Sequence, residues 1–135
     1  MALTKATISA ESPCLVRVQT INTLRDILGA TRPGFKQSWS TKDALAALAS
    51  ADQGVLVIVG QPYQTDQELA QIQSFPDIPA ADRSVAESGV YRVIGAGSQI
   101  LRALGVGKMR LLSSPSRYNA LSGFGLEVVE FIEAE

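Results

Sequence analysis

At 135 residues the chain is long enough to bury one hydrophobic core, so we expect a single domain over residues 1–135. Its 12 basic and 13 acidic residues give a net charge of −1, which argues against a nucleic-acid-binding protein because such proteins carry an excess of Lys and Arg. The hydrophobic content of 46% includes no sustained apolar segment, which excludes a membrane span. We therefore expect a soluble protein that binds neither nucleic acid nor membrane.

Two residue types that carry much enzyme chemistry are almost missing. The chain has no histidine, which removes the commonest general base and transition-metal ligand. Its only cysteine is Cys14, so neither an internal disulfide nor a thiolate zinc site can form. The absence of disulfides predicts a cytoplasmic protein, and we expect Cys14 to be a packing residue in an apolar strand.

The first part of the chain alternates strand-like and helix-like segments. Residues 14–19 (CLVRVQ) form an apolar run that predicts a buried strand. Residues 20–29 have apolar positions at helical spacing and end at Gly29, which predicts a helix. An irregular loop containing Pro33 should follow over residues 30–39.

The next two elements have the clearest local signals. Ser40 stands three residues before Asp43, a spacing typical of a capped helix start, and predicts a helix that closes before Gly54. Residues 55–60 (VLVIVG) form a nearly continuous β-branched run. Such a run predicts an interior strand of a sheet that is covered on both faces.

The second half of the chain is less regular. We expect one helix at residues 65–73 and a flexible surface loop at 74–89. A further helix over residues 95–105 should lead into strands at 108–113 and 126–132. This alternation predicts an α/β fold, a three-layer sandwich with a mixed, mainly parallel sheet between helices.

The segment GSQILRALGVGKMRLLSSPSRYNALSGFGLEVVE, residues 97–130, closely resembles the C-terminal part of GTP cyclohydrolase II, an enzyme of riboflavin biosynthesis. Residues 15–19 (LVRVQ) and 44–59 (ALAALASADQGVLVIV) resemble earlier segments of the same family, in the same order. The resemblance implies a GTP cyclohydrolase II-like fold. By the same comparison, residues 1–5 resemble a strand from inside the family's domain.

That comparison predicts that the chain is a fragment without the family's first strands. The expected parent is a bifunctional riboflavin-pathway protein in which a covalently linked 3,4-dihydroxy-2-butanone 4-phosphate synthase domain precedes this one. We expect the parent protein to be an enzyme of that pathway and this chain alone to be inactive.

The family's metal ligands are not retained. The resemblance places a histidine and a cysteine shortly after the LVRV strand and a Cys-x-Cys further on, and the three thiolates hold a catalytic zinc. Here Gln19, Asn22 and the loop 31–39 (TRPGFKQSW) stand at these positions. We therefore expect no cofactor and no zinc, since water is not activated without its metal. Phe35 and Trp39 are expected to fill the space of the missing metal site.

The family's other functional positions are mostly replaced as well. Its Glu-Gly-Arg falls on residues 62–64 (PYQ), and its catalytic Asp-x-Arg falls on Val90 and Arg92. The resemblance implies no catalytic residue and a vestigial ligand-binding set of Arg17, Arg92 and Ser113. A nucleotide or a small phosphate is the expected ligand. The competing interpretation is structural, with the arginines ion-paired or solvated and the serine a helix cap.

Three hypotheses follow for function. The first is a catalytically degenerate domain with a structural, dimer-forming or regulatory role, in a homodimeric protein. The second is a nucleotide-binding module without turnover, and the third is an active enzyme with changed chemistry. The glycines in residues 93–97 (VIGAG) do not support dinucleotide binding, because the full GxGxxG spacing and an acidic partner are missing.

Overall fold

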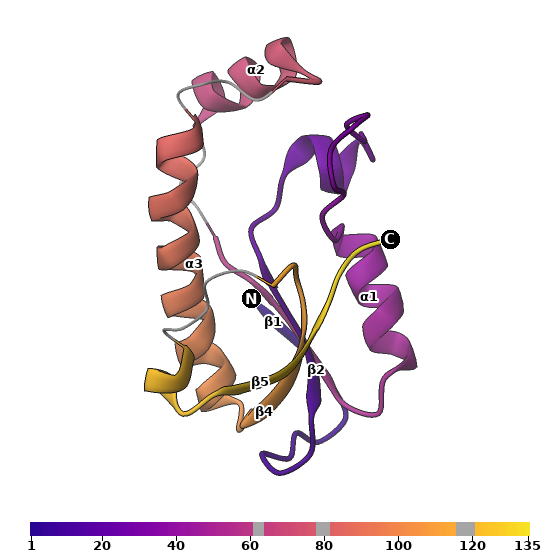
Figure 1. Ribbon diagram of the computed structural model, residues 1–135, viewed down its shortest axis with the longest axis vertical. Coiled ribbons are helices and arrows are strands. Elements are labelled where there is room, and N and C mark those ends of the chain that lie inside the picture. Colours follow the sequence, from indigo (N-terminus) through magenta and orange to yellow (C-terminus); the bar gives the residue numbers. More distant parts are fainter. Residues whose placement is uncertain (61–63, 78–81, 116–120) are drawn as a thin grey trace.

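The structure is a computed structural model that describes residues 1–60, 64–77, 82–115 and 121–135. Its centre is a five-stranded sheet with the strand order β1-β3-β2-β4-β5 (Figure 1). β1 pairs antiparallel with β3, and the other neighbouring strands are parallel. The predicted mixed, mainly parallel α/β sheet is therefore confirmed. The strands are β1 (Ala2–Lys5), β2 (Cys14–Gln19), β3 (Gly54–Ile58), β4 (Lys108–Leu112) and β5 (Glu127–Ile132).

Helices α1 (Thr41–Ser50) and α3 (Asp82–Ala103) cover opposite faces of this sheet (Figure 1). Leu101 of α3 packs in one buried cluster, and Ala44 and Leu48 of α1 pack in another. Helix α2 (Thr65–Ser74) has no buried residue and lies beyond the end of the sheet. It begins and ends within one residue of the prediction.

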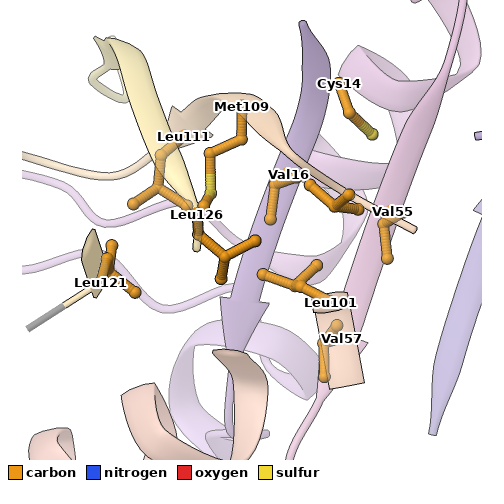
Figure 2. Close-up of a cluster of buried hydrophobic side chains, with 10 residues drawn as sticks. Cys14, Val16, Val55, Val57, Leu101, Met109, Leu111, Leu121 and Leu126 are labelled. Atoms are coloured by element: carbon orange, nitrogen blue, oxygen red, sulfur yellow. The ribbon is translucent and has the colours of Figure 1, made fainter. Parts of the chain in front are cut away.

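Strand β2 shows why both faces need cover. Its alternate residues Cys14 and Val16 join the cluster beneath α3, whereas Leu15 joins the cluster beneath α1. Figure 2 shows the α3-side cluster, in which Val16 lies among side chains of β3, β4 and α3. A strand buried on both faces reads as a continuous apolar run, which explains the pattern of residues 14–16, and the strand then continues with the buried polar residues Arg17 and Gln19.

The start of α1 follows from local chemistry. The Ser40 side chain accepts a hydrogen bond from the Asp43 backbone N–H at 3.1 Å, which satisfies one of the free donors of the first helical turn. The Ser40 hydroxyl also donates to the Asp43 carboxylate at 2.6 Å. The sequence predicts the start of this helix correctly because the capping signal, Ser40 and Asp43, spans only four residues.

The helix predicted at residues 20–29 is much shorter in the structure. Only a five-residue helical segment, η1 (Thr23–Ile27), forms there. Ile27 and Leu28 are 69% and 64% exposed, so the helical spacing of apolar residues does not correspond to a buried face. Without an apolar partner, the segment gains little from continuing as a helix.

The predicted flexible loop at 74–89 is also corrected. Helix α3 begins at Asp82, so residues 82–89 are helical, while 78–81 lie outside the described residues. The glycines that had suggested a helix start near residue 95 are internal. A Cβ on Gly97 would lie 2.6 Å from Val18 Cγ1, so this glycine lets α3 approach β2 closely. Such packing offsets the cost of about 1 kcal/mol for glycine in a helix.

Candidate functional site

The candidate site lies where β2 and β4 end, on the face of the sheet that α1 covers. Arg17 is 8% exposed, and its two neighbours along β2, Val16 and Val18, belong to the opposite face. Its Nη1 donates to the backbone oxygen of Leu112 at 2.7 Å, and its Nε donates to Gln19 Oε1 at 2.8 Å. The guanidinium therefore joins the carboxyl ends of two parallel strands.

Arg17 also reaches the segment that precedes α1. Its Nη2 lies 3.3 Å from the Trp39 backbone oxygen and 3.4 Å from Ser38 Oγ. Hydrogen bonds to a charged donor are about twice as strong as those between neutral groups. Arg17 therefore fastens residues 38 and 39 to the sheet.

Gln19 continues the network. It is 4% exposed, and while its Oε1 accepts from Arg17, its Nε2 donates to Thr41 Oγ1 at 2.5 Å. The Thr41 hydroxyl in turn donates to Asp26 Oδ1 at 3.0 Å. Both ends of the Gln19 amide are thus occupied by protein groups.

Asp26 is the only carboxylate of this network, and its side chain is 3% exposed. It accepts from the backbone N–H groups of Asn22 and Thr41, each at 2.8 Å, and pairs with Arg25 at 2.6 Å. Burial acts to raise the pKa of Asp26. The hydrogen bonds from Arg25, Asn22 and Thr41 and the charge of Arg25 outweigh burial and lower the pKa to about 2.

Asn22, where the resemblance places a cysteine, is a structural residue here. Its Oδ1 accepts from the Arg25 backbone N–H at 3.0 Å and caps η1, and its Nδ2 donates to Gln71 of α2 at 3.3 Å. Thr23 also contacts α2 through Glu68. These bonds attach α2 to the segment after β2.

The three predicted ligand residues are not brought together on one face. Ser113 directly follows Leu112, the β4 residue that Arg17 contacts, so Arg17 and Ser113 lie at neighbouring strand ends. Ser113 is half-buried, and its hydroxyl donates to the Ser114 backbone oxygen at 3.2 Å. Arg92 is exposed on α3, which covers the other face of the sheet. Whether any of the three binds a ligand stays a prediction.

Of the two aromatic residues expected to fill the space of the missing metal site, only Trp39 is packed inside the structure, and whether it fills that space stays a prediction. Trp39 packs against the α1-side cluster, and its Nε1 donates to the Ile132 backbone oxygen at 2.8 Å. Phe35 is 53% exposed and fills no internal space. The loop between residues 31 and 39 has few local constraints, so the sequence could not distinguish the two aromatic residues.

Other predicted features take their expected structural places. Cys14 is fully buried in the α3-side cluster, and burial raises the pKa of its thiol to about 11. The glycines of residues 93–97 lie inside α3 and form no phosphate-binding loop. Of the residues at the family's Glu-Gly-Arg, Pro62 and Tyr63 lie outside the described residues, and Gln64 is exposed before α2.

The residues at the family's metal positions do not fit a zinc ion. Zinc in proteins takes thiolate, imidazole or carboxylate ligands, whereas Gln19 and Asn22 offer amides that already bind protein groups. The Arg17 guanidinium, 2.8 Å from Gln19 Oε1, adds a positive charge that opposes a cation. Among the residues that the structure describes, no three His, Cys, Asp or Glu side chains gather in a way that could hold a metal.

Sequence reasoning missed Asp26 and Thr41. They are separated by 15 positions, and nothing local marks either as a member of a buried network. The one signal in the sequence is an acidic residue, Asp26, directly after an arginine, Arg25. Within the described part of the chain, no helix is long and apolar enough to cross a membrane.

Comparison with known proteins gives consistent matches over this fold. The 3,4-dihydroxy-2-butanone 4-phosphate synthase of Pseudomonas aeruginosa is 45% identical over 135 residues, which covers all of this chain and 36% of that protein. A riboflavin biosynthesis protein RibBA of Chlorobium phaeovibrioides is 30% identical over 142 residues, covering all of this chain and 34% of that protein. The chain thus spans about a third of the length of these relatives.

A solved structure is similar as well. The crystal structure of RibBX, a two-domain 3,4-dihydroxy-2-butanone 4-phosphate synthase from A. baumannii, matches with a TM-score of 0.63 and 37% identity. The match covers 99% of this chain and 31% of that one. The family model described as GTP cyclohydrolase II matches residues 1–133, nearly the full length. On these grounds the chain belongs to the GTP cyclohydrolase II family.

Proposed function

We propose that the chain is a catalytically degenerate GTP cyclohydrolase II-like domain of a riboflavin-biosynthesis protein. In this proposal it is covalently linked to a 3,4-dihydroxy-2-butanone 4-phosphate synthase domain, and its role is structural, dimer-forming or regulatory. Relatives and a solved structure that bear the synthase name, and that are about three times as long, support this assignment.

One observation carries the proposal. Gln19 stands where the family has a histidine, and both ends of its amide are bound to protein groups, Oε1 to Arg17 and Nε2 to Thr41. A position whose hydrogen bonds are complete cannot also ligate a metal without breaking them, and breaking them leaves buried donors unsatisfied. Zinc-dependent hydrolysis needs a metal that activates water, and among the described residues no three His, Cys, Asp or Glu side chains gather to hold one.

The test is a GTP turnover assay on the full-length protein, with and without added Zn²⁺. Release of formate is followed, with an active GTP cyclohydrolase II as the positive control. We expect no release above the enzyme-free background under either condition. Turnover of GTP would refute the degenerate assignment.

The proposed role of the domain is tested separately. Synthase activity and molar mass by light scattering are compared for the full-length protein and for a truncated form without this domain. We expect the full-length protein to be a homodimer, and its truncation to change dimer formation or synthase rate. No change in either quantity would contradict a dimer-forming or regulatory role.

A second candidate, a nucleotide- or phosphate-binding module without turnover, is favoured by one contact. Arg17 binds the Leu112 backbone oxygen and so places a cation beside Ser113 at the end of β4. Calorimetric titration with GTP, GDP and inorganic phosphate tests it, with Arg17→Lys as the variant. Heat that saturates and weakens in the variant would support binding, and no heat with any of the three would refute it.

A further inference from the structure

The buried polar residues of the α1 face connect parts of the chain that are otherwise held together by few apolar contacts. Arg17 and Gln19 come from β2, Asp26 from η1, and Thr41 from the first turn of α1. The intervening segment, residues 20–40, has one buried apolar side chain, Leu24, and one partly buried residue, Trp39, that packs against the α1-side cluster. Apolar burial alone therefore gives this segment little attachment to the sheet.

A continuous series of hydrogen bonds supplies that attachment. It runs from the Leu112 backbone oxygen through Arg17, Gln19 and Thr41 to Asp26, with steps of 2.7, 2.8, 2.5 and 3.0 Å. Each donor meets an acceptor, and no buried side-chain nitrogen or oxygen in the described part of the chain lacks a partner. A fully satisfied buried network is rigid, because every alternative arrangement leaves a polar group unpaired.

We propose that this network is a metal-free cross-link that fastens residues 20–41 to the sheet, at the position where the family resemblance places a zinc ion. The inference rests on the proposed loss of the metal and names the residues that hold the segment in its absence. Gln19 is the central member, since it links the Arg17 guanidinium on β2 to the Thr41 hydroxyl on α1. Asp26 fixes the far end through the backbone N–H groups of Asn22 and Thr41.

The test uses Trp39, the only tryptophan of the chain, as a reporter. Trp39 lies within the segment, packs against the α1-side cluster and donates to the Ile132 backbone oxygen, so its fluorescence changes if the segment detaches. Thermal unfolding of the full-length protein is followed by Trp39 emission in variants that remove one link each. Tryptophans in a linked synthase domain would add to the emission. The 135-residue chain, whose only tryptophan is Trp39, is therefore measured in parallel.

Gln19→Leu keeps the side-chain size and removes both hydrogen bonds. We expect it to lower the melting temperature by about 5–10 °C, because it leaves the Arg17 Nε and the Thr41 hydroxyl without their partner. Gln37→Leu is the matched control, since Gln37 is exposed in the same segment and bonds only to the nearby backbone oxygens of Arg32 and Phe35. We expect the control to change the melting temperature by less than about 2 °C.

A double-mutant cycle distinguishes a network from independent contacts. Thr41→Val removes the hydroxyl that receives from Gln19 and donates to Asp26. If the residues act as one cross-link, the double variant loses several degrees less than the sum of the single variants. Strictly additive losses, or no loss in Gln19→Leu, would overturn the inference. Thr41→Val, the milder change, keeps the test open if Gln19→Leu does not fold.

Metal dependence is the decisive readout. We expect EDTA and added Zn²⁺ to leave both the melting temperature and the Trp39 emission of the unmodified chain unchanged. A melting temperature that falls with EDTA would show that a metal, and not the network, holds the segment. This outcome is independent of the GTP assay, so a failure of the cross-link inference is distinguishable from a failure of the proposed function.

Discussion

The α3 face and the α1 face of the sheet are stabilised by different kinds of interaction, although β2 contributes to both. Toward α3 this strand presents Cys14 and Val16 to an apolar cluster (Figure 2). Val18 packs against the same cluster. Toward α1 it presents Leu15 and then the polar residues Arg17 and Gln19 at its carboxyl end. One face is held by apolar burial along its length, and the other changes to directional hydrogen bonds where the strand ends.

The difference shows which substitutions each face can tolerate. Side chains in an apolar core are replaceable only by groups of similar volume, since cavities and overpacking both cost stability. A polar edge tolerates a substitution provided each buried group still finds a hydrogen-bond partner. The two faces should therefore respond differently to substitution and to pH.

The largest expected effect is on the α3 face. Leu101→Ala removes a side chain that is 2% exposed at the centre of the apolar cluster. We expect the free energy of unfolding to fall by about 3 kcal/mol, the lost burial plus the cavity. Urea unfolding measures it, with Leu45→Ala as the control because Leu45 of α1 is 41% exposed. Equal losses in the two variants would contradict the assigned core.

Next comes the α1 face, through its carboxylate. Asp26→Asn keeps the side-chain shape but removes the charge that pairs with Arg25, and we expect a loss of about 2 kcal/mol at neutral pH.

The same variant tests the sign of the pH dependence. Because folding lowers the pKa of Asp26 from 3.8 to about 2, the unfolded chain binds the proton more readily. The stability that Asp26 contributes is complete above about pH 4 and disappears as the pH falls toward about 2. Urea unfolding across this range should show the unmodified chain converging on the Asn variant. If the free energies of unfolding of the unmodified chain and the Asn variant differ by a constant amount down to pH 2, the carboxylate is excluded as the cause. Leu101→Ala, by contrast, should not converge with the unmodified chain as the pH falls.

A smaller effect concerns the contact between α3 and β2. In Gly97→Ala the added Cβ meets Val18 Cγ1 at 2.6 Å, so despite the better helix propensity of alanine we expect a net loss of about 1 kcal/mol. Gly95→Ala is the matched control, since its Cβ would meet nothing within 4 Å, and we expect a gain of up to about 1 kcal/mol. Changes of the same sign in thermal unfolding would argue against the close approach.

The smallest effect is expected outside both faces. Arg110 of β4 and Glu130 of β5 form an ion pair with side chains that are 46% and 50% exposed. We expect Glu130→Gln to change the free energy of unfolding by less than about 0.5 kcal/mol, and less still in high salt. A loss of stability as large as that of Asp26→Asn would mean that solvent exposure does not explain why the surface ion pair and the buried network differ in their contribution to stability.

Some parts of the molecule were predictable because their signals are short in range. Ser40 and Asp43 located the start of α1, and the apolar runs located β2 and β3. The prediction failed where a residue's role depends on a distant partner. The glycines before residue 98 were taken for a helix boundary, and only Val18 of β2 explains why Gly97 is inside a helix.

The candidate site was predictable only in part for the same reason. The resemblance predicts that Gln19 and Asn22 stand at the family's metal-ligand positions. The hydrogen-bond partners in the network were not visible in the sequence, since Gln19 and Thr41 are 22 positions apart and Arg17 and Leu112 are 95 apart. The prediction that Arg17, Arg92 and Ser113 share a ligand stays untested, although the structure places Arg92 on the helix that covers the other face.

Periodicity, capping residues and segment similarity were sufficient to establish the α/β class, most of the elements and the family of this chain. They act over a few residues, where backbone hydrogen bonds and side-chain spacing determine the conformation. Folding determined which side of the sheet each polar residue faces, how closely α3 approaches β2, and which buried groups satisfy one another. Those outcomes depend on atoms far apart in the chain, since a buried polar group must find whichever partner the packed structure brings within reach.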